Sequence, residues 1–428
     1  MKIEKKDLAK SQIELTIELS FDEFKPYIEK GAEKVSREVK IEGFRPGKVP
    51  YEILKQKIGE MTILEESAHI AVNKTIDEAI SKNTKRQVVG QPQISITKLA
   101  PENPLEYKVI FAVIPELTLG DYKNFKIKKE KAEVDVKEVE KMLNQLREMR
   151  AKEVSVDREV KDKDKIIVDI DMFLDKVPVD GGQSKDTAIV VGKGYIVPGF
   201  GKKIIGAKKD EVREFNLPYP KEHHQANLAG KLVEFKVKVK DIFERQLPEI
   251  NEEFVKGIGL KSKEELEENI KKNMLLEKEQ RANQKAESDI LDKIIEKTKF
   301  SDIPEVLVDS ESKNMMSELE GNIAQQGGKF DDYLGHIKKT REQLVLDLLP
   351  NAIKRVKTSL LIREIANVEK INISDNEVEK EIMAMKFQYK DNNKIVARIK
   401  TPEYKAYLKN LMSGRKVIEK LLEWNIEK

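Results

Sequence analysis

The helical, highly charged second half of the chain is the feature that most constrains the fold. From Pro248 onwards, apolar residues recur at three- and four-residue steps, which indicates helices, but the apolar stripes are narrow. Charged residues make up 37% of the 428-residue chain and aromatic residues 6%. Narrow stripes with few large side chains cannot fill one thick core, so the pattern predicts extended, arm-like helices with partly accessible inner faces. We expect about five or six helices, divided at Pro304, Gly327-Gly328, Ser374-Asp375 and Pro402.

The first part of the chain mixes strand and helix periodicities. Residues 11–19 alternate between apolar and polar side chains, as in a half-buried strand. A helical stretch begins at Phe21 with Ser20 as its N-cap, and a second one ends near Ser81. Two strand-like runs follow, at residues 88–99 and 105–114. This order of elements predicts an α+β domain over residues 1–113.

The middle of the chain changes texture twice. Residues 126–150 are intensely charged and carry one helical apolar stripe, so we expect a connecting helical linker over residues 114–150. Residues 151–245 contain short β-rich runs between turns that bear glycine and proline, which predicts a compact, mostly antiparallel β domain with a short helix. Residues 246–428 form the helical region. The predicted fold class is therefore multidomain α+β with an extended all-α C-terminal domain.

Composition excludes several kinds of chemistry. The chain has no cysteine, which removes disulfides, thiol nucleophiles and thiolate metal sites. Its four histidines are His69, His223, His224 and His336. Although His223 and His224 follow Glu222, no third ligand converges on them in the sequence, so we expect no metal site. No glycine loop of the Walker type occurs, which indicates independence from nucleotides, and no cofactor is expected.

Charge and hydropathy bear on partners and location. Lys and Arg number 80 against 77 Asp and Glu, a net charge of +3, so any basic surface has to be local. No window approaches the roughly 18 consecutive apolar residues of a membrane span. The amino terminus lacks the apolar run of a signal peptide. We therefore expect a cytoplasmic protein without a membrane partner.

The most distinctive segment is Gly43-Phe44-Arg45-Pro46-Gly47-Lys48-Val49-Pro50. Two glycines and two prolines set its conformation, which leaves Phe44, Arg45 and Lys48 to project. Such a loop suits RNA or an acidic protein surface, because arginine pairs with phosphate or carboxylate and a phenylalanine ring can anchor in a small pocket. The alternative is an ordinary turn between two helices with a buried Phe44.

This loop resembles the ribosome-docking signature of the bacterial trigger factor family, G-F-R-x-G-K-x-P. The fixed positions are met by Gly43, Phe44, Arg45, Gly47, Lys48 and Pro50. Residues 196–200, 247–249 and 303–311 are similar to other segments of the family, so the resemblance spans essentially the whole chain. It implies an ATP-independent chaperone that docks on the ribosome near the nascent-chain exit tunnel, binds nascent and unfolded polypeptides, and assists their folding and export.

The resemblance also implies an FKBP-type peptidyl-prolyl isomerase domain over residues 151–245. Such domains desolvate the X-Pro amide in an aromatic-lined pocket and thereby favour the twisted transition state. The pocket residues that it implies are Ile196, Phe200 and Phe235. Three positions that are usually aromatic fall at Ile170, Val179 and His223, and the aromatics expected to compensate are Phe173 and Tyr195. We therefore expect a prolyl isomerase of reduced activity.

Methionines are scattered over the C-terminal helices. They are Met274, Met315, Met316, Met383, Met385 and Met412. Because methionine is flexible and polarisable, an exposed set would suit a surface that accepts many apolar sequences. The alternative is that they fill gaps between helices.

Other functions fit parts of this pattern. One is a helical-arm folding factor or scaffold that acts away from the ribosome, for example in the cell envelope, with the isomerase domain as a binding module. Another is an RNA-binding scaffold, but the balanced charge opposes it, and the breaks at Pro304 and Gly327-Gly328 oppose a continuous coiled coil. We expect no dedicated nucleic-acid site beyond a contact with ribosomal RNA.

Overall fold

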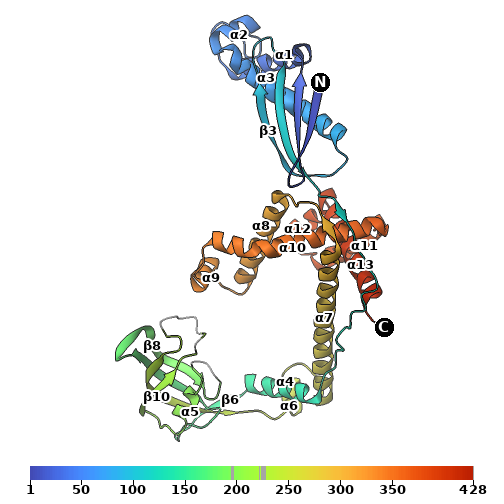
Figure 1. The fold of residues 1–428 in the computed structure, drawn as a ribbon. Helices are drawn as coiled ribbons and strands as arrows, with labels where there is room; N and C mark the ends of the chain where they lie inside the picture. Colours follow the sequence, from blue (N-terminus) through green and yellow to red (C-terminus); the bar gives the residue numbers. More distant parts are fainter. Residues whose placement is uncertain (194–196, 221, 223–227, 428) are drawn as a thin grey trace. The chain divides into compact units, whose positions relative to one another are not determined.

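The computed structural model describes residues 1–193, 197–220, 222 and 228–427 (Figure 1). The chain forms two compact units, one made of Met1–Lys129 with Asn283–Lys428 and the other of Glu130–Ala282. Ile196 and Tyr195, as well as His223 and His224, lie outside the described residues. Each unit is described in turn below.

The first unit begins with a four-stranded antiparallel sheet. Its strands are β1 (Lys2–Leu8), β2 (Gln12–Leu19), β3 (Val88–Lys98) and β4 (Leu105–Val113), in the order β1-β2-β4-β3. The apolar residues of β2 are at most 2% exposed, as the alternation predicts. Strand β1 was not predicted, because its sequence is dominated by charged residues and it lies at the edge of the sheet.

Helices α1 (Phe21–Glu38), α2 (Tyr51–Ile58) and α3 (Glu60–Asn83) follow β2. The N-cap prediction is confirmed, since Ser20 forms a capping box with Glu23. Helices α1 and α3 approach closely at Gly31, where a Cβ would lie 2.0 Å from the Ser67 Oγ. The second helical stretch is divided at Gly59, whose φ of +88° is incompatible with a continuous helix.

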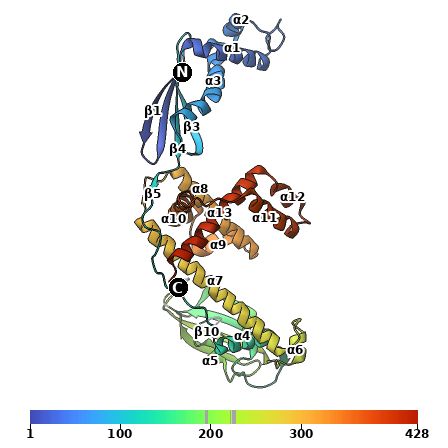
Figure 2. The same cartoon turned by 90° about the vertical axis from the view of Figure 1, so that its right-hand side faces the viewer.

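The helical region comprises α6 (Glu252–Lys256), α7 (Lys263–Lys297), α8 (Glu305–Gln325), α9 (Phe330–Ile337), α10 (Arg341–Val368), α11 (Asp375–Gln388), α12 (Asn393–Arg398) and α13 (Pro402–Asn425). The predicted breaks at Pro304 and Gly327-Gly328 fall between helices, and those at Ser374-Asp375 and Pro402 fall at the starts of α11 and α13. In the described chain the helices number eight rather than five or six, because α6 and α12 are too short to show a period. Helices α11 and α13 pack together around Ile382 and Leu408 (Figure 2).

An extended segment, residues 119–127, lies against the helical part of the first unit; we call it the strap. It follows β5 (Leu117–Thr118), which pairs with β11 (Lys299–Phe300). The Tyr122 hydroxyl donates a hydrogen bond to Glu369 at 2.6 Å. Burial and this contact raise the pKa of Tyr122 to about 12. The charged stretch predicted to be helical from residue 126 is helical only in α4 (Val136–Met149), which belongs to the second unit.

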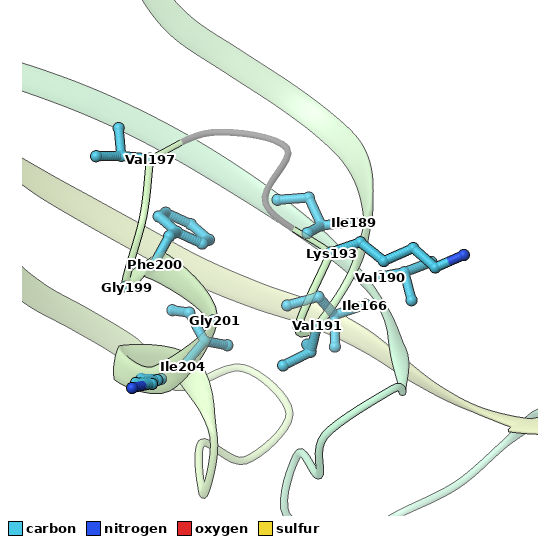
Figure 3. A pocket seen from close by; sticks show the side chains of 12 residues that line it. Ile166, Ile189, Val190, Val191, Lys193, Val197, Gly199, Phe200, Gly201 and Ile204 are labelled. Carbon is cyan, nitrogen blue, oxygen red and sulfur yellow. The ribbon is translucent and has the colours of Figure 1, made fainter. Parts of the chain in front are cut away.

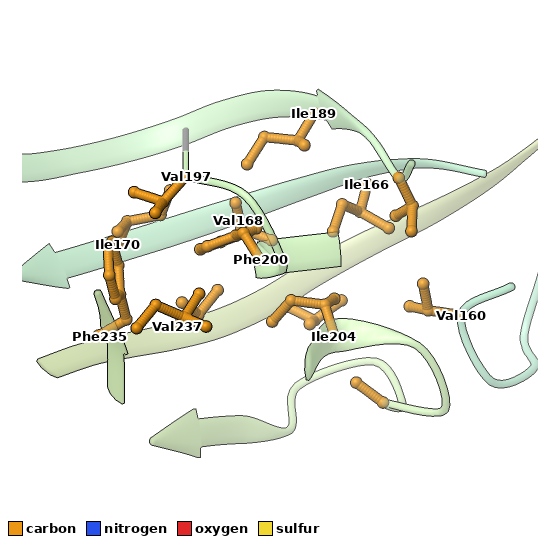
Figure 4. Close-up of a cluster of buried hydrophobic side chains, with 14 of the residues drawn as sticks. Val160, Ile166, Val168, Ile170, Ile189, Val197, Phe200, Ile204, Phe235 and Val237 are labelled. Carbon is orange, nitrogen blue, oxygen red and sulfur yellow. The ribbon is translucent and has the colours of Figure 1, made fainter. Parts of the chain in front are cut away.

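The second unit contains a five-stranded antiparallel sheet. The strands are β6 (Lys152–Ser155), β7 (Lys165–Leu174), β8 (Val177–Val190), β9 (Val212–Pro218) and β10 (Leu232–Gln246), in the order β6-β10-β7-β8, with β9 also paired to β10. The short helix α5 (Phe200–Ile204) packs with the sheet around one apolar core (Figure 4). The predicted antiparallel β domain with a short helix is thus present.

Candidate functional site

Two backbone N–H groups of the loop between α1 and α2 donate hydrogen bonds to Ser36 of α1. The Gly47 N–H donates to the Ser36 carbonyl at 2.9 Å, and the Val49 N–H donates to the Ser36 Oγ at 3.1 Å. Ser36 itself is only 1% exposed. Gly43 and Gly47 have φ values of +86° and +78°, which favour glycine strongly. These features give the loop a defined conformation.

Apolar side chains at both ends of the loop anchor it in a small core. Ile41 and Val49 pack against the core that contains Val35, Leu54 and Ile63. This anchoring turns the remaining side chains of the loop outward. The prediction that the loop projects Phe44, Arg45 and Lys48 agrees with this arrangement, because all three are exposed.

The exposure of Phe44 favours the interpretation of the loop as a binding surface over that of a turn that buries the ring. Its ring is 38% exposed although a small apolar core lies directly below the loop. Neither Arg45 nor Lys48 pairs with a carboxylate among the described residues, so both cations are available to a partner. A turn that merely buried Phe44 would not leave one ring and two cations facing solvent.

The second unit holds an apolar cavity of about 150 Å³ beside α5 (Figure 3). Its apolar walls include Ile166, Ile189, Val197 and Phe200. The pocket is partly open and also reaches Lys193 and Lys202, and its volume is similar to that of cavities that hold a benzene-sized group. The predicted pocket residue Phe200 therefore lines a cavity, whereas Ile196 lies outside the described residues.

Phe235 lies beneath Phe200 rather than at the cavity. The two rings meet edge to face, with centroids 5.7 Å apart, and Phe235 is fully buried. Phe215 stacks on Phe235 at 5.8 Å and meets Phe200 at 5.5 Å, while the Tyr219 ring lies parallel to Phe235 at 6.3 Å. Burial raises the pKa of Tyr219. Phe200 thus rests on a cluster of three other rings.

Two members of this cluster, Phe215 and Tyr219, were missed in the sequence. They belong to the run Phe215-Asn-Leu217-Pro-Tyr219, in which apolar residues alternate and so share one face of a strand. That period of two was the available signal. At the positions where the family resemblance led us to expect rings, Ile170 is buried in the core and Val179 packs against it.

The methionines do not form one exposed surface. Met316 is 3% exposed, and Met274, Met385 and Met412 pack against apolar cores. Only Met383, at 65%, is largely exposed among the six. The gap-filling alternative is therefore correct for most of them.

The described parts of the chain contain neither a cluster of side chains suited to a metal ion nor a helix suited to crossing a membrane. Within those parts, no group of three or more His, Asp or Glu side chains is arranged to hold a metal ion. None of the described helices is both long and apolar enough to cross a bilayer.

Known proteins and family models match this chain along most of its length. Family models described as "Bacterial trigger factor protein (TF)", "FKBP-type peptidyl-prolyl cis-trans isomerase" and "Bacterial trigger factor protein (TF) C-terminus" match residues 1–146, 156–240 and 262–423. A trigger factor of Caldicellulosiruptor saccharolyticus is 33% identical over 389 residues, which cover 91% of this chain and 88% of that relative. The chain belongs to the bacterial trigger factor family. A trigger factor of Desulforamulus reducens is 30% identical over 428 residues, 99% of this chain and 98% of the relative.

The central part of this family member is an FKBP-type peptidyl-prolyl cis-trans isomerase domain, and the chain is a trigger factor chaperone. A solved structure described as "Promiscuous Substrate Recognition in Folding and Assembly Activities of the Trigger Factor Chaperone" aligns over 99% of both chains, with 21% identity and a TM-score of 0.49.

Proposed function

We propose that this chain is an ATP-independent chaperone that docks on the ribosome near the nascent-chain exit tunnel and binds nascent and unfolded polypeptides in the cytoplasm. The observation that carries the docking role is the anchored loop that exposes Phe44, Arg45 and Lys48 together. A preformed loop loses little conformational entropy on binding, so one ring and two cations suffice for a specific contact. Gly43, Gly47 and Pro50 hold the loop in this conformation.

We assign the parts of the chain accordingly. Residues 1–113 would bind the ribosome and residues 114–150 would serve as a linker. Residues 151–245 would form the isomerase domain, and residues 246–428 would hold clients. The isomerase pocket would consist of Ile196, Phe200 and Phe235. Phe235 would act indirectly, by supporting the ring of Phe200. The aliphatic residues at Ile170 and Val179 support a reduced isomerase activity.

The docking role is tested by replacing Phe44, Arg45 and Lys48 together with alanine. We expect the variant to lose co-sedimentation with ribosomes while it still prevents aggregation of an unfolded client, because the loop's anchoring residues are untouched. A matched control replaces two exposed cations of the same domain, Lys25 and Lys74, with alanine and should co-sediment normally. Loss of both activities in the loop variant would show that the loop is structural.

A further inference from the structure

The segment Met383–Leu411, here called the basic tip, concentrates positive charge. It has seven basic and two acidic residues, a net charge of +5, against +3 for the whole chain. Its basic residues are Lys386, Lys390, Lys394, Arg398, Lys400, Lys405 and Lys409. By contrast, residues 305–337 carry seven acidic and two basic residues, a net charge of −5. Although the net charge of the whole chain is close to zero, one compact unit contains two helical segments of opposite net charge.

The basic tip also gathers exposed aromatic side chains. Phe387 is 82% exposed, Tyr407 58% and Tyr389 37%. In the described chain, these are three of the four Phe, Tyr or Trp side chains that are exposed to this extent. The fourth is Phe44 of the docking loop, which is also flanked by cations. In the described chain, exposed aromatic side chains with neighbouring cations therefore occur at two places, the loop at residues 43–50 and the basic tip.

These rings are not left over from an unfilled core. The basic tip has its own core beneath, built from Ile373, Val378, Ile382 and Leu408. On α11, Met383 and Phe387 are four residues apart and share the opposite, solvent-facing side of the helix, while Lys386 lies partly buried between that side and the core. The basic tip is therefore folded around its own core, and its exposed apolar side chains form a surface that can bind a partner.

Most of the positive charge at the tip is uncompensated. Lys405 pairs with Glu379, and Lys409 pairs with Asp375 at 2.9 Å. Within the described residues the other five cations form no ion pair, although Lys386 is near enough to Glu379 to help lower the pKa of that carboxyl. They are Lys386, Lys390, Lys394, Arg398 and Lys400. Free cations interleaved with apolar rings complement a chain in which carboxylates alternate with apolar side chains.

We propose that the basic tip binds unfolded polypeptide segments in which Asp or Glu is interspersed with aromatic or aliphatic residues. This inference rests on the proposed chaperone function and adds a charge preference to it. It follows that the tip selects acidic clients, while the acidic segment 305–337 of the same unit disfavours them.

The chemistry of the tip favours polypeptide over single-stranded RNA. Four of its five free cations are lysines, which lack the planar fork that binds phosphate in bidentate fashion. The rings of Tyr404 and Tyr407 are tilted by 48°, so they offer no parallel platform for stacked bases. The exposed Met383 and Leu411 suit side chains rather than bases.

The test uses two fluorescently labelled peptides with the same apolar residues, one with glutamates and one with lysines at the remaining positions. Fluorescence anisotropy measures their binding to the full chain at physiological salt. We expect the acidic peptide to bind about tenfold more tightly. Replacement of Lys386, Lys394 and Arg398 by glutamate should remove this preference. Replacement of Lys25, Lys74 and Lys271, three exposed lysines elsewhere, by glutamate changes the net charge equally and should preserve it.

A second variant, Phe387→Ala, tests whether the acidic peptide binds a specific surface of the basic tip or is attracted only by its overall positive charge. Because Phe387 is 82% exposed, its removal should leave the circular dichroism spectrum unchanged, yet we expect it to weaken binding of the acidic peptide several-fold. Equal binding of both peptides to the unaltered chain, or equal losses in the tip and control triple variants, would overturn the inference. So would an oligouridylate that binds the tip more tightly than the acidic peptide does.

Failure of this inference is distinguishable from failure of the chaperone function. If the unaltered chain prevents aggregation of an unfolded client but shows no charge preference, the chaperone function stands and the basic tip is not its acidic-client site. If the unaltered chain prevents no aggregation, the proposed chaperone function itself is wrong.

Discussion

At the level of single residues, the isomerase domain keeps a ring at Phe200 but surrounds it differently from the family pattern. Positions 170 and 179 hold the aliphatic residues Ile170 and Val179. The rings in contact with Phe200 are Phe215 of β9 and Phe235 of β10, and Tyr219, which follows β9, stacks on Phe235. These rings pack in the core of the domain, and none of them except Phe200 lines the cavity beside α5. We therefore expect low catalytic power with an intact fold.

We therefore predict weak acceleration of proline isomerisation by the intact chain and a further loss in Phe200→Leu. This substitution shortens the wall of the cavity and removes buried ring contacts, so it costs some stability, but less than the roughly 3–5 kcal/mol of a Phe→Ala truncation. We expect about a tenfold fall in rate on a short X-Pro peptide, equivalent to ~1.4 kcal/mol of transition-state stabilisation. Val177→Ala, at an exposed position of the same domain, serves as the control. An unchanged rate in Phe200→Leu would exclude the cavity beside α5 as the isomerase site.

Residue-level prediction from the sequence succeeded where chemistry is local and fell short where neighbours come from distant strands. The glycines and prolines of the loop at residues 43–50 dictate its backbone, so its projecting side chains were predictable. The packing of Phe215 and Tyr219 under Phe200 depends on the pairing of β9 with β10, which no local pattern specifies. The cavity beside α5 depends on the same tertiary arrangement.

At the level of elements, helix α11 begins with a strong cap. The Ser374 side chain and backbone bind Glu377 in a capping box. These hydrogen bonds, followed by the nearby Lys416, lower the pKa of Glu377 to about 2. Ionic contacts with Lys409 and Lys405 also lower the pKa values of Asp375 and Glu379. The start of α11 is therefore secured by ionised carboxylates.

The lowered pKa of Glu377 predicts an acid-sensitive end of α11. Its contribution to folding is fully present above the ordinary pKa of 4.5 and is lost as the pH falls from there towards about 2. We expect Glu377→Gln to increase amide exchange in α11 near neutral pH, and to differ less from the unaltered chain as the pH falls below 4.5. Glu381→Gln, on the same helix but away from the cap, is the control. A difference that does not depend on pH would contradict the role of the ionised cap.

Sequence patterns predicted the long elements better than the short or charged ones. Ser374 and Pro402 were correct helix starts because capping and proline geometry are local. Strand β1 and helix α12 escaped prediction, since one is a charged edge strand and the other has six residues. Their formation depends on pairing with β2 and on packing in the helical region rather than on their own periodicity.

At the level of the whole molecule, hydrogen bonds within the first unit join the strap to the C-terminal end of α13, two segments about 300 residues apart in the sequence. Asn425, only 1% exposed, accepts a hydrogen bond from the Phe125 N–H at 3.0 Å and donates to the Tyr122 carbonyl at 3.0 Å. The strap continues this contact, because Ile127 forms a parallel bridge with Ile426. Backbone hydrogen bonds join the same segments, from the Asn124 N–H to the Trp424 carbonyl at 3.3 Å and from the Ile127 N–H to the Asn425 carbonyl at 2.7 Å. The C-terminal end of α13 thus holds the strap through the buried Asn425 amide and through the backbone.

We predict that Asn425→Ala releases the strap from α13. The substitution leaves the Phe125 N–H and the Tyr122 carbonyl without their partner, and each unsatisfied buried group costs about 1–3 kcal/mol. The sole tryptophan, Trp424, is adjacent and carries Lys123 of the strap 4.2 Å above its ring, so its fluorescence should report the release. We expect red-shifted emission and a fluorescence transition in urea at lower concentration than the loss of helical circular dichroism. Asn410→Ala, at an exposed position of α13, should retain the original emission and coincident transitions. Coincident, unshifted transitions in Asn425→Ala would mean that the apolar contacts of the strap hold it without the amide.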